Sequence, residues 1–133
     1  MVLVDLIDET FVVCDAEVLA ARLHDEELWN TWWPELQLTI FMDRGAAGVR
    51  WSISGELFGS SEIWLEPFSD GVIVHYYLRA DVPASDEMSG GKRIGERIRG
   101  QRAQRWKIHI NALKDEIEGG RAPGCPRLVA TLD

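Results

Sequence analysis

The chain has 133 residues, of which 46% are hydrophobic and 27% charged, a composition typical of a soluble globular domain. No apolar run approaches the roughly 18 residues that a membrane span needs, and the net charge of −8 argues against a nucleic-acid-binding protein. The segment from Met1 to Asp5 lacks the basic residues of a signal peptide, so we expect none. Because Cys14 and Cys125 are the only cysteines, we expect a cytoplasmic protein with free thiols.

The charge is unevenly distributed along the chain. Residues 1–87 carry 17 acidic and 4 basic side chains, whereas residues 92–107 carry seven basic side chains against one acidic side chain. One interpretation is that these cations pair with acidic side chains elsewhere in the domain. The alternative is that they remain exposed and form an interface with a partner, such as a second copy of the chain.

The first third of the chain predicts a strand followed by two short helices. The segment Leu3–Cys14 is dense in β-branched and aromatic residues, which favours a strand. Asp15 is a suitable N-cap for a helix over Ala16–His24, and a second helix over Glu26–Thr31 follows. The sequence Trp32-Trp33-Pro34 ends that helix, because the residue before a proline is disfavoured in the α region.

Trp29, Trp32 and Trp33 form a dense group of tryptophans at the end of this region. They either pack the two short helices against the rest of the domain as a hydrophobic plug or form the rim of a pocket.

The middle of the chain predicts an antiparallel meander. Its expected strands are separated by segments rich in Gly, Pro, Asp and Ser, which favour turns and hairpin loops. The expected strands are Leu36–Met42, Gly48–Ser54, Glu56–Glu66 and Val72–Val82, and the expected loops are Asp43–Ala47, Pro67–Gly71 and Pro83–Gly91.

The segment Lys92–Glu118 predicts one long helix of roughly 40 Å, ended by Gly119-Gly120. Arg102 and His109 lie in the middle of its otherwise apolar face. The apolar residues of that face are Ile94, Ile98, Trp106, Leu113 and Ile117. Residues 119–133 are expected to form an extended tail.

This order of elements indicates an α+β fold in which a curved antiparallel sheet wraps around the long C-terminal helix. Strand twist and the glycines within the strands favour curling of such a sheet. A long helix lying across a curled sheet commonly leaves a cavity between them. We see no repeat and no second domain.

The chain resembles the SRPBCC, or START-like, helix-grip superfamily, and within it the small polyketide cyclase/dehydrase-like proteins of actinobacteria. The resemblance rests on Phe11-Val-Val-Cys-Asp-Ala-Glu-Val18, on Trp32-Trp33-Pro34, on Ile63-Trp-Leu-Glu-Pro-Phe-Ser-Asp-Gly-Val-Ile-Val74, and on the terminal long helix. It covers about residues 3–118, so residues 1–118 are expected to form a single SRPBCC-like domain. The resemblance implies a hydrophobic-ligand cavity under the long helix, but no catalytic residue can be transferred from it.

Arg102 and His109 are the leading candidates for a polar spot in such a cavity. A buried guanidinium needs a partner, so Arg102 either pairs with Glu56, Glu62 or Asp8 or binds a carboxylate or keto oxygen of the ligand. His109 is either a satisfied core residue or a general acid/base. The expected aromatic residues of the ligand site are Trp33, Trp51, Tyr76 and Trp106, for each of which core packing is the alternative.

These observations lead to three hypotheses. The first is a non-catalytic protein that binds a small hydrophobic or amphipathic ligand, lipid-like or polyketide-like. The second is an aromatase/cyclase-like enzyme that uses Arg102, His109 or Tyr76. The third is a protein-interaction module, such as a homodimer, that uses the basic helix face and the tryptophan group. No metal or other cofactor is expected, since His24, His75 and His109 lack ligand spacing.

Overall fold

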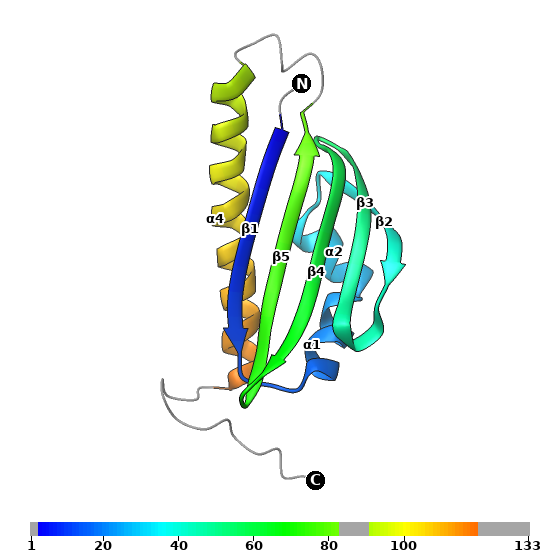
Figure 1. Ribbon diagram of the computed structural model, residues 1–133, viewed down its shortest axis with the longest axis vertical. Helices are drawn as coiled ribbons and strands as arrows, with labels where there is room; N and C mark the ends of the chain where they lie inside the picture. The colour runs from blue at the N-terminus through cyan, green and yellow to red at the C-terminus, as the bar shows by residue number, and fades with distance from the viewer. Residues whose placement is uncertain (1–2, 83–90, 120–133) are drawn as a thin grey trace.

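A computed structural model describes residues 3–82 and 91–119 of the chain and shows the predicted order of elements. A long strand is followed by two short helices, four further strands and a helix that runs the length of the sheet (Figure 1). The elements are β1 (Leu3–Val12), α1 (Ala16–Leu23), α2 (Glu26–Trp32), β2 (Leu36–Asp43), the 3₁₀ turn η1 (Gly45–Ala47), β3 (Gly48–Gly55), β4 (Phe58–Phe68), β5 (Gly71–Asp81) and α4 (Gly91–Glu118).

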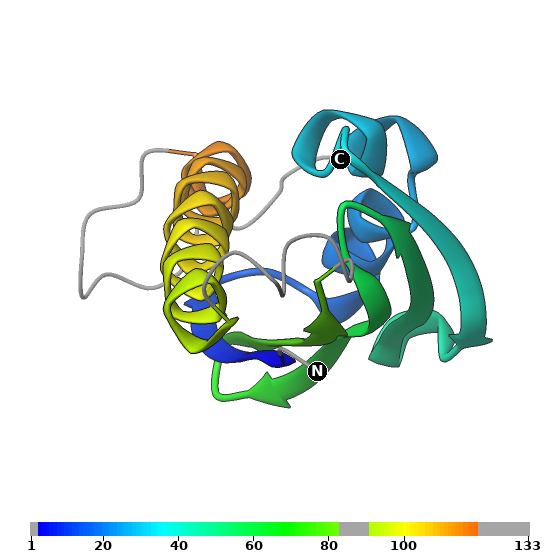
Figure 2. The ribbon, with the colours of Figure 1, turned by 90° about the horizontal axis from the view of Figure 1, so that it is seen from above.

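The five strands form one antiparallel sheet in the order β1-β5-β4-β3-β2. The predicted meander from β2 to β5 is therefore confirmed, and β1 is added beside β5 at the far edge. Viewed along the strands, the sheet curls, with α4 along one side and α1 and α2 at the other (Figure 2). The α+β helix-grip architecture expected from the sequence is present.

Each strand differs from the prediction by one or two residues at one or both ends, and β4, for example, spans Phe58–Phe68 rather than Glu56–Glu66. Strand β1 ends at Val12 rather than Cys14. The loop between β4 and β5 is shorter than the predicted Pro67–Gly71, because Phe68 still pairs with Gly71. Ser69 adopts a positive φ of 54°, and this left-handed residue lets the chain reverse in two residues.

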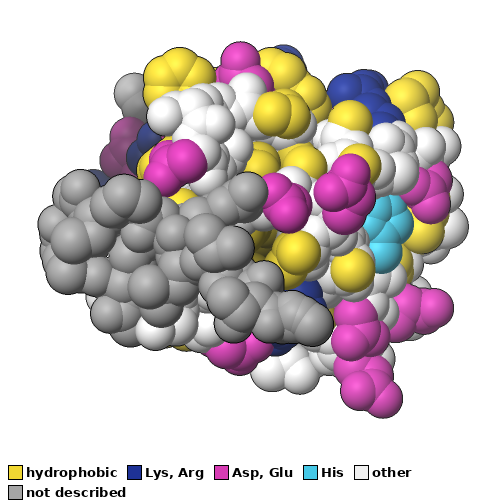
Figure 3. All heavy atoms as spheres, turned by 90° about the horizontal axis from the view of Figure 1, so that it is seen from below, with side chains coloured by type: hydrophobic (Ala, Val, Ile, Leu, Met, Phe, Trp, Pro, Cys, Tyr) yellow, Lys and Arg dark blue, Asp and Glu magenta, His cyan; other side chains and the backbone are white. Residues whose placement is uncertain are grey.

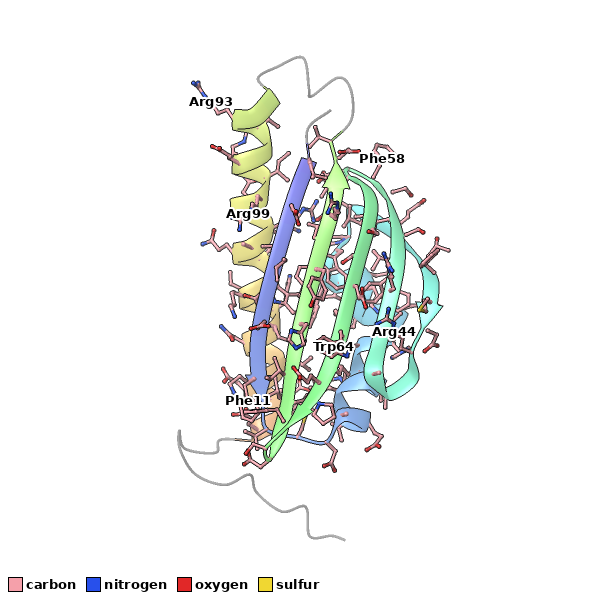
Figure 4. All side chains as sticks on the ribbon, in the orientation of Figure 1. Phe11, Arg44, Phe58, Trp64, Arg93 and Arg99 are labelled. Atoms are coloured by element: carbon pink, nitrogen blue, oxygen red, sulfur yellow. The ribbon has the colours of Figure 1, made fainter. Side chains whose placement is uncertain are left out.

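The long helix covers the free edge of β1. Arg99 Nε donates to the carbonyl of Asp5 at 2.9 Å, and the Lys114 ammonium donates to the carbonyl of Phe11 at 2.7 Å. Arg99 lies on the side of α4 that adjoins β1 (Figure 4). Side chains of α4 thus satisfy backbone groups that an edge strand would otherwise expose. This pairing accounts for part of the basic segment.

The core lies between the concave face of the sheet and the helices. Trp106 and Leu113 of α4 are buried, as predicted from the helical pattern, while Ile94, Ile98 and Ile117 are partly buried. Ile110, which the prediction omitted, is fully buried. The core also contains Val4, Leu6, Val12, Leu19, Leu23, Trp29, Trp32, Trp33, Trp51, Ile53, Ile63, Leu65, Val74, Tyr76 and Leu78.

Acidic side chains are spread over the lower end of the molecule, with hydrophobic atoms between them (Figure 3). None of the helices in the described part of the chain is long and apolar enough to cross a membrane. The predicted loop over Pro83–Gly91 lies outside the described residues except for Gly91, which begins α4, and the predicted tail lies outside them except for Gly119.

Candidate functional site

Six aromatic residues gather between the sheet and α4, and we call them the aromatic cluster. None is more than 7% exposed. They come from four different elements and from the connector that joins α2 to β2. The aromatic cluster consists of Trp29, Trp32, Trp33, Trp51, Tyr76 and Trp106.

Three rings of the aromatic cluster are almost parallel. Tyr76 stacks on Trp106 with ring centroids 4.0 Å apart and an interplanar angle of 10°. Trp33 lies 6.2 Å from Tyr76 and 6.5 Å from Trp106, at angles of 10° and 2°. Offset stacking of this kind is a favoured arrangement of aromatic rings. The stacking brings together aromatic rings from the connector, from β5 and from α4.

The indole N–H of Trp51 has no acceptor among the described residues, although the residue is 0% exposed. The neighbouring indoles are satisfied within the protein. Trp29 Nε1 donates to the carbonyl of Leu23 at 2.7 Å, and Trp106 Nε1 donates to Asp8 Oδ2 at 2.8 Å. A buried donor without an acceptor costs about 1–3 kcal/mol. Trp51 is therefore the member of the aromatic cluster whose buried N–H donor lacks an acceptor among the described residues.

The Tyr76 hydroxyl remains protonated at every physiological pH. Burial raises its pKa to about 12, and hydrogen bonding with Ser61, the charge of Arg102 and hydrogen bonding with Trp33 only partly oppose the increase. Tyr76 can therefore donate a hydrogen bond, but it does not supply a phenolate near neutral pH.

Arg102 is buried, with 7% of its side chain exposed, and it is bound by two carboxylates. Its guanidinium donates to Glu35, whose side chain is 15% exposed, and to Glu56 Oε2 at 3.3 Å. Arg105 adds a second cation to Glu35 at 3.0 Å. The ion pair with Glu56 was one of the pairings predicted for Arg102, while Glu35 was not considered.

Glu35 is placed by the connector and by a close backbone approach. Its carbonyl accepts a hydrogen bond from Glu56 N at 3.3 Å. Gly55 has a φ of 114°, and a Cβ atom at this position would lie 2.5 Å from the Glu35 carbonyl oxygen. Burial raises the pKa of the Glu35 carboxyl, but hydrogen bonds from Arg105 and its own N–H, and the charge of Arg102, outweigh burial and lower it.

His109 lies at the flank of the aromatic cluster and is partly buried. Its ring stacks on Trp32 with centroids 5.3 Å apart and an angle of 10°. Burial and the positive charge of Arg105 lower the pKa of His109, and the negative charge of Glu35 partly opposes them. The imidazole is therefore held mainly in its neutral form at neutral pH.

No family model matches the sequence, and no curated protein matches it. Solved structures do match the fold. The Aha1 dimer from Colwellia psychrerythraea has a TM-score of 0.61 at 14% identity, with 90% of this chain and 99% of that chain covered. DR_A0006 from Deinococcus radiodurans has a TM-score of 0.61 at 15% identity, with 88% and 98% covered.

A third match is the di-domain ARO/CYC StfQ from the steffimycin biosynthetic pathway. It has a TM-score of 0.59 at 14% identity, with 89% of this chain and 53% of that chain covered. The fold shared with these structures is the helix-grip fold. At such low identities the likeness establishes the helix-grip fold alone.

Within this helix-grip fold, five of the six predicted site residues are buried together. Trp33 contacts Trp51 at 5.7 Å between ring centroids as well as Tyr76 and Trp106, and Arg102 lies at the edge of the group. His109 joins it only through Trp32. The other predicted partners of Arg102 are engaged elsewhere, since Glu62 pairs with Arg44 at 2.9 Å and Asp8 binds Trp106 and Lys107.

Two surface hollows lie apart from the aromatic cluster. One, of about 350 Å³, lies between α1 and η1 and is lined in part by His24 and Asp43. The other, of about 370 Å³, lies beside Gly59 on the sheet. Within residues 3–82 and 91–119, no three His, Cys, Asp or Glu side chains are grouped to hold a metal ion.

Proposed function

We propose that the protein binds a small hydrophobic or amphipathic ligand against the aromatic cluster, between the sheet and α4. The helix-grip fold supports this proposal, because the resemblance to that superfamily implies a ligand site under the long helix. We propose residues 1–118 as the ligand-binding domain, with a lipid-like or polyketide-like compound as the ligand. The shortage of cysteines supports a cytoplasmic setting.

The orphaned indole N–H of Trp51 carries the proposal. Buried polar groups are almost always hydrogen-bonded in proteins, and apolar ligand sites typically contain a few polar groups that orient the ligand. Trp51 presents one such donor among aromatic rings. A ligand oxygen that accepts from Trp51 would satisfy this donor. The residues proposed to bind the ligand are Trp33, Trp51, Tyr76, Arg102, Trp106 and His109.

The surroundings favour a flat and neutral ligand. The rings of Trp33, Tyr76 and Trp106 already stack on one another, and we propose that a planar ring system adds to this stack. Arg102 is already bound by Glu35 and Glu56, so an anionic ligand would have to displace a carboxylate. We therefore assign Arg102 to the polar boundary of the site and the keto or ether oxygen of the ligand to Trp51.

A matched pair of probes tests this assignment. 2-Acetylnaphthalene and 2-ethylnaphthalene have nearly the same shape, but only the ketone accepts a hydrogen bond. We expect both to bind, with the ketone about 5-fold tighter, equivalent to about 1 kcal/mol for one hydrogen bond. Binding is measured by isothermal titration calorimetry and by quenching of tryptophan fluorescence.

The Trp51→Phe variant should lose the preference for the ketone while still binding 2-ethylnaphthalene. Trp29→Phe is the matched control, because it makes the same change in the same cluster at an indole whose N–H is already bonded. If the wild type binds neither probe at 1 mM, the proposed function is refuted. A Kd of 1 mM corresponds to a binding free energy of only about −4 kcal/mol. A ketone preference that persists in Trp51→Phe would refute the role of Trp51.

The geometry gives less support to the other two functions. An aromatase/cyclase-like enzyme needs titratable groups that converge on a substrate, but Arg102 is paired and His109 stacks on Trp32 at the flank. An interface on the basic helix face needs free cations, yet Lys107 binds Asp8 at 3.1 Å and Arg105 binds Glu35. Native mass spectrometry of protein purified from its own host would identify a co-purifying ligand directly.

A further inference from the structure

The two edges of the sheet differ in how they are covered. The β1 edge is covered by α4, whose side chains donate to its backbone carbonyls. The β2 edge is not paired with any strand in the described part of the chain, and it forms the opposite margin of the sheet (Figures 1 and 2). Unpaired strand edges are ready templates for another strand.

Strand β2 carries few of the devices that usually protect an edge, namely the bulge at Phe41 and Asp43 as its last residue. Between Leu36 and Met42 it contains no charged residue and no proline. Three consecutive apolar side chains near its end are exposed, with Ile40 at 44%, Phe41 at 63% and Met42 at 44%. Lysine, proline and inward-pointing charges are the usual means by which proteins prevent edge pairing. The β2 edge is therefore open to association.

The hydrogen-bonding direction of β2 can be followed residue by residue. Glu35 faces β3, because its carbonyl accepts from Glu56 N. Backbone groups alternate between the two sides of an antiparallel strand, so Gln37 and Thr39 face β3 as well, while Leu38 and Ile40 face outward. The β-bulge at Phe41 shifts this alternation by one residue, since Met42, and not Phe41, pairs with Arg50 of β3.

We propose that the β2 edge binds the β2 edge of a second copy of the chain, antiparallel and with the twofold axis at Thr39. In this register Leu38 lies opposite Ile40 of the other copy, and each pair exchanges hydrogen bonds in both directions. The interface gains roughly four backbone hydrogen bonds. The Thr39 residues of the two copies meet with their Cα atoms about 4.5 Å apart.

A second copy fits this edge better than an unrelated strand does, because the edge is complementary to itself. A symmetric dimer uses the same surface on both subunits, and Leu38 then faces Ile40 while Leu36 lies opposite Met42. The register places Asp43 opposite Glu35 of the other copy, but the charge of Glu35 is already balanced by Arg102 and Arg105. The net charge of −8 on each copy predicts that added salt strengthens the dimer.

Cysteine cross-linking tests the register. A Thr39→Cys variant, made in a Cys125→Ser background, should form a disulfide-linked dimer under mild oxidation, because the Cα separation expected at the axis suits a disulfide. Ser52→Cys in the same background is the control. Ser52 is exposed and pairs with Thr39 on the neighbouring strand, but it lies one strand away from the edge. It should form no disulfide-linked dimer.

Sedimentation equilibrium of the unmodified chain and of two lysine variants tests the interface. Thr39→Lys places two ammonium groups together at the axis and should abolish the dimer, while Ser52→Lys should leave it intact. Equal loss of the dimer in both lysine variants would place the interface on the sheet face and overturn the proposal. A wild-type chain that remains monomeric up to 0.5 mM would also overturn it.

Discussion

At the scale of single residues, the protonation of His109 depends on two neighbours of opposite charge. The positive charge of Arg105 lowers the pKa of His109, and the negative charge of Glu35 raises it. We expect Arg105→Gln to raise the pKa of His109 and Glu35→Gln to lower it further. The titration is followed by two-dimensional NMR of the imidazole nitrogens between pH 4 and pH 8.

Lys114→Gln is a suitable control for this titration. Lys114 lies on the same helix, and its ammonium binds the Phe11 carbonyl and Glu118 instead of facing His109. It should leave the pKa of His109 in place. Shifts in the same direction for Arg105→Gln and Glu35→Gln would show that loss of packing, rather than charge, controls the imidazole.

The sequence predicts the position of Arg102 on the helix well, but it does not predict the main carboxylate partner of Arg102. Helical spacing alone places Arg102 on the inner face of the long helix, where the structure has it. The partner Glu35 depends on the path of the chain after Trp33-Pro34, which no periodic pattern encodes. The free N–H of Trp51 is likewise invisible in the sequence, because satisfaction of a donor depends on three-dimensional neighbours.

At the scale of elements, two glycines should respond to substitution in opposite ways. A Cβ atom at Gly100 of α4 meets nothing within 4 Å, so Gly100→Ala should stabilise the protein by about 0.5–1 kcal/mol through higher helix propensity. Gly55→Ala should destabilise it, because of the positive φ and the approach to the Glu35 carbonyl. Urea unfolding followed by circular dichroism measures both. Stabilisation by Gly55→Ala would contradict the close approach described for this turn.

Element boundaries were predicted well where a pattern of side chains ends sharply. The helix expected over residues 92–118 occupies Gly91–Glu118, because the polar and apolar periodicity stops at Gly119-Gly120. The β4–β5 loop was predicted too long, since Pro67 and Phe68 are compatible with a turn but pair with β5. Ile110 lies about 40° from Trp106 around the helix, so the helical pattern also places it on the inner face, and the prediction omitted it.

At the scale of the whole molecule, α4 is held from two sides. Its basic side chains cover β1, and Arg102 and Arg105 bind Glu35 at the far arm of the curled sheet. The lowered pKa of Glu35 means that its carboxylate stabilises the fold above the unfolded pKa of about 4.5. This contribution is lost as the pH falls through the lower pKa of the folded state.

We therefore expect the free energy of unfolding of the wild type to fall more steeply with acidification below about pH 4.5 than that of Glu35→Gln. At pH 7 the variant should be less stable by about 1.5–3 kcal/mol, the range for hydrogen bonds to charged groups. Glu116→Gln, which breaks the exposed ion pair with Arg22, should change the curve much less. If the free energy of unfolding of wild type and of Glu35→Gln changed in parallel with pH, the stabilising role proposed for the ion pairs between Glu35 and α4 would be contradicted.

The pairing of β1 with β5 has a consequence for how the chain acquires its fold. Val12 pairs with Val72 and Leu3 with Asp81, so the first strand must wait for the fifth to be synthesised. The hairpins from β2 to β5 need only local contacts and can form first. Contacts between distant parts of the sequence slow folding because loop closure must come before they do. The newly made chain therefore exposes both edges of β1 until β5 and α4 have emerged, and this is the interval in which misassembly competes with folding.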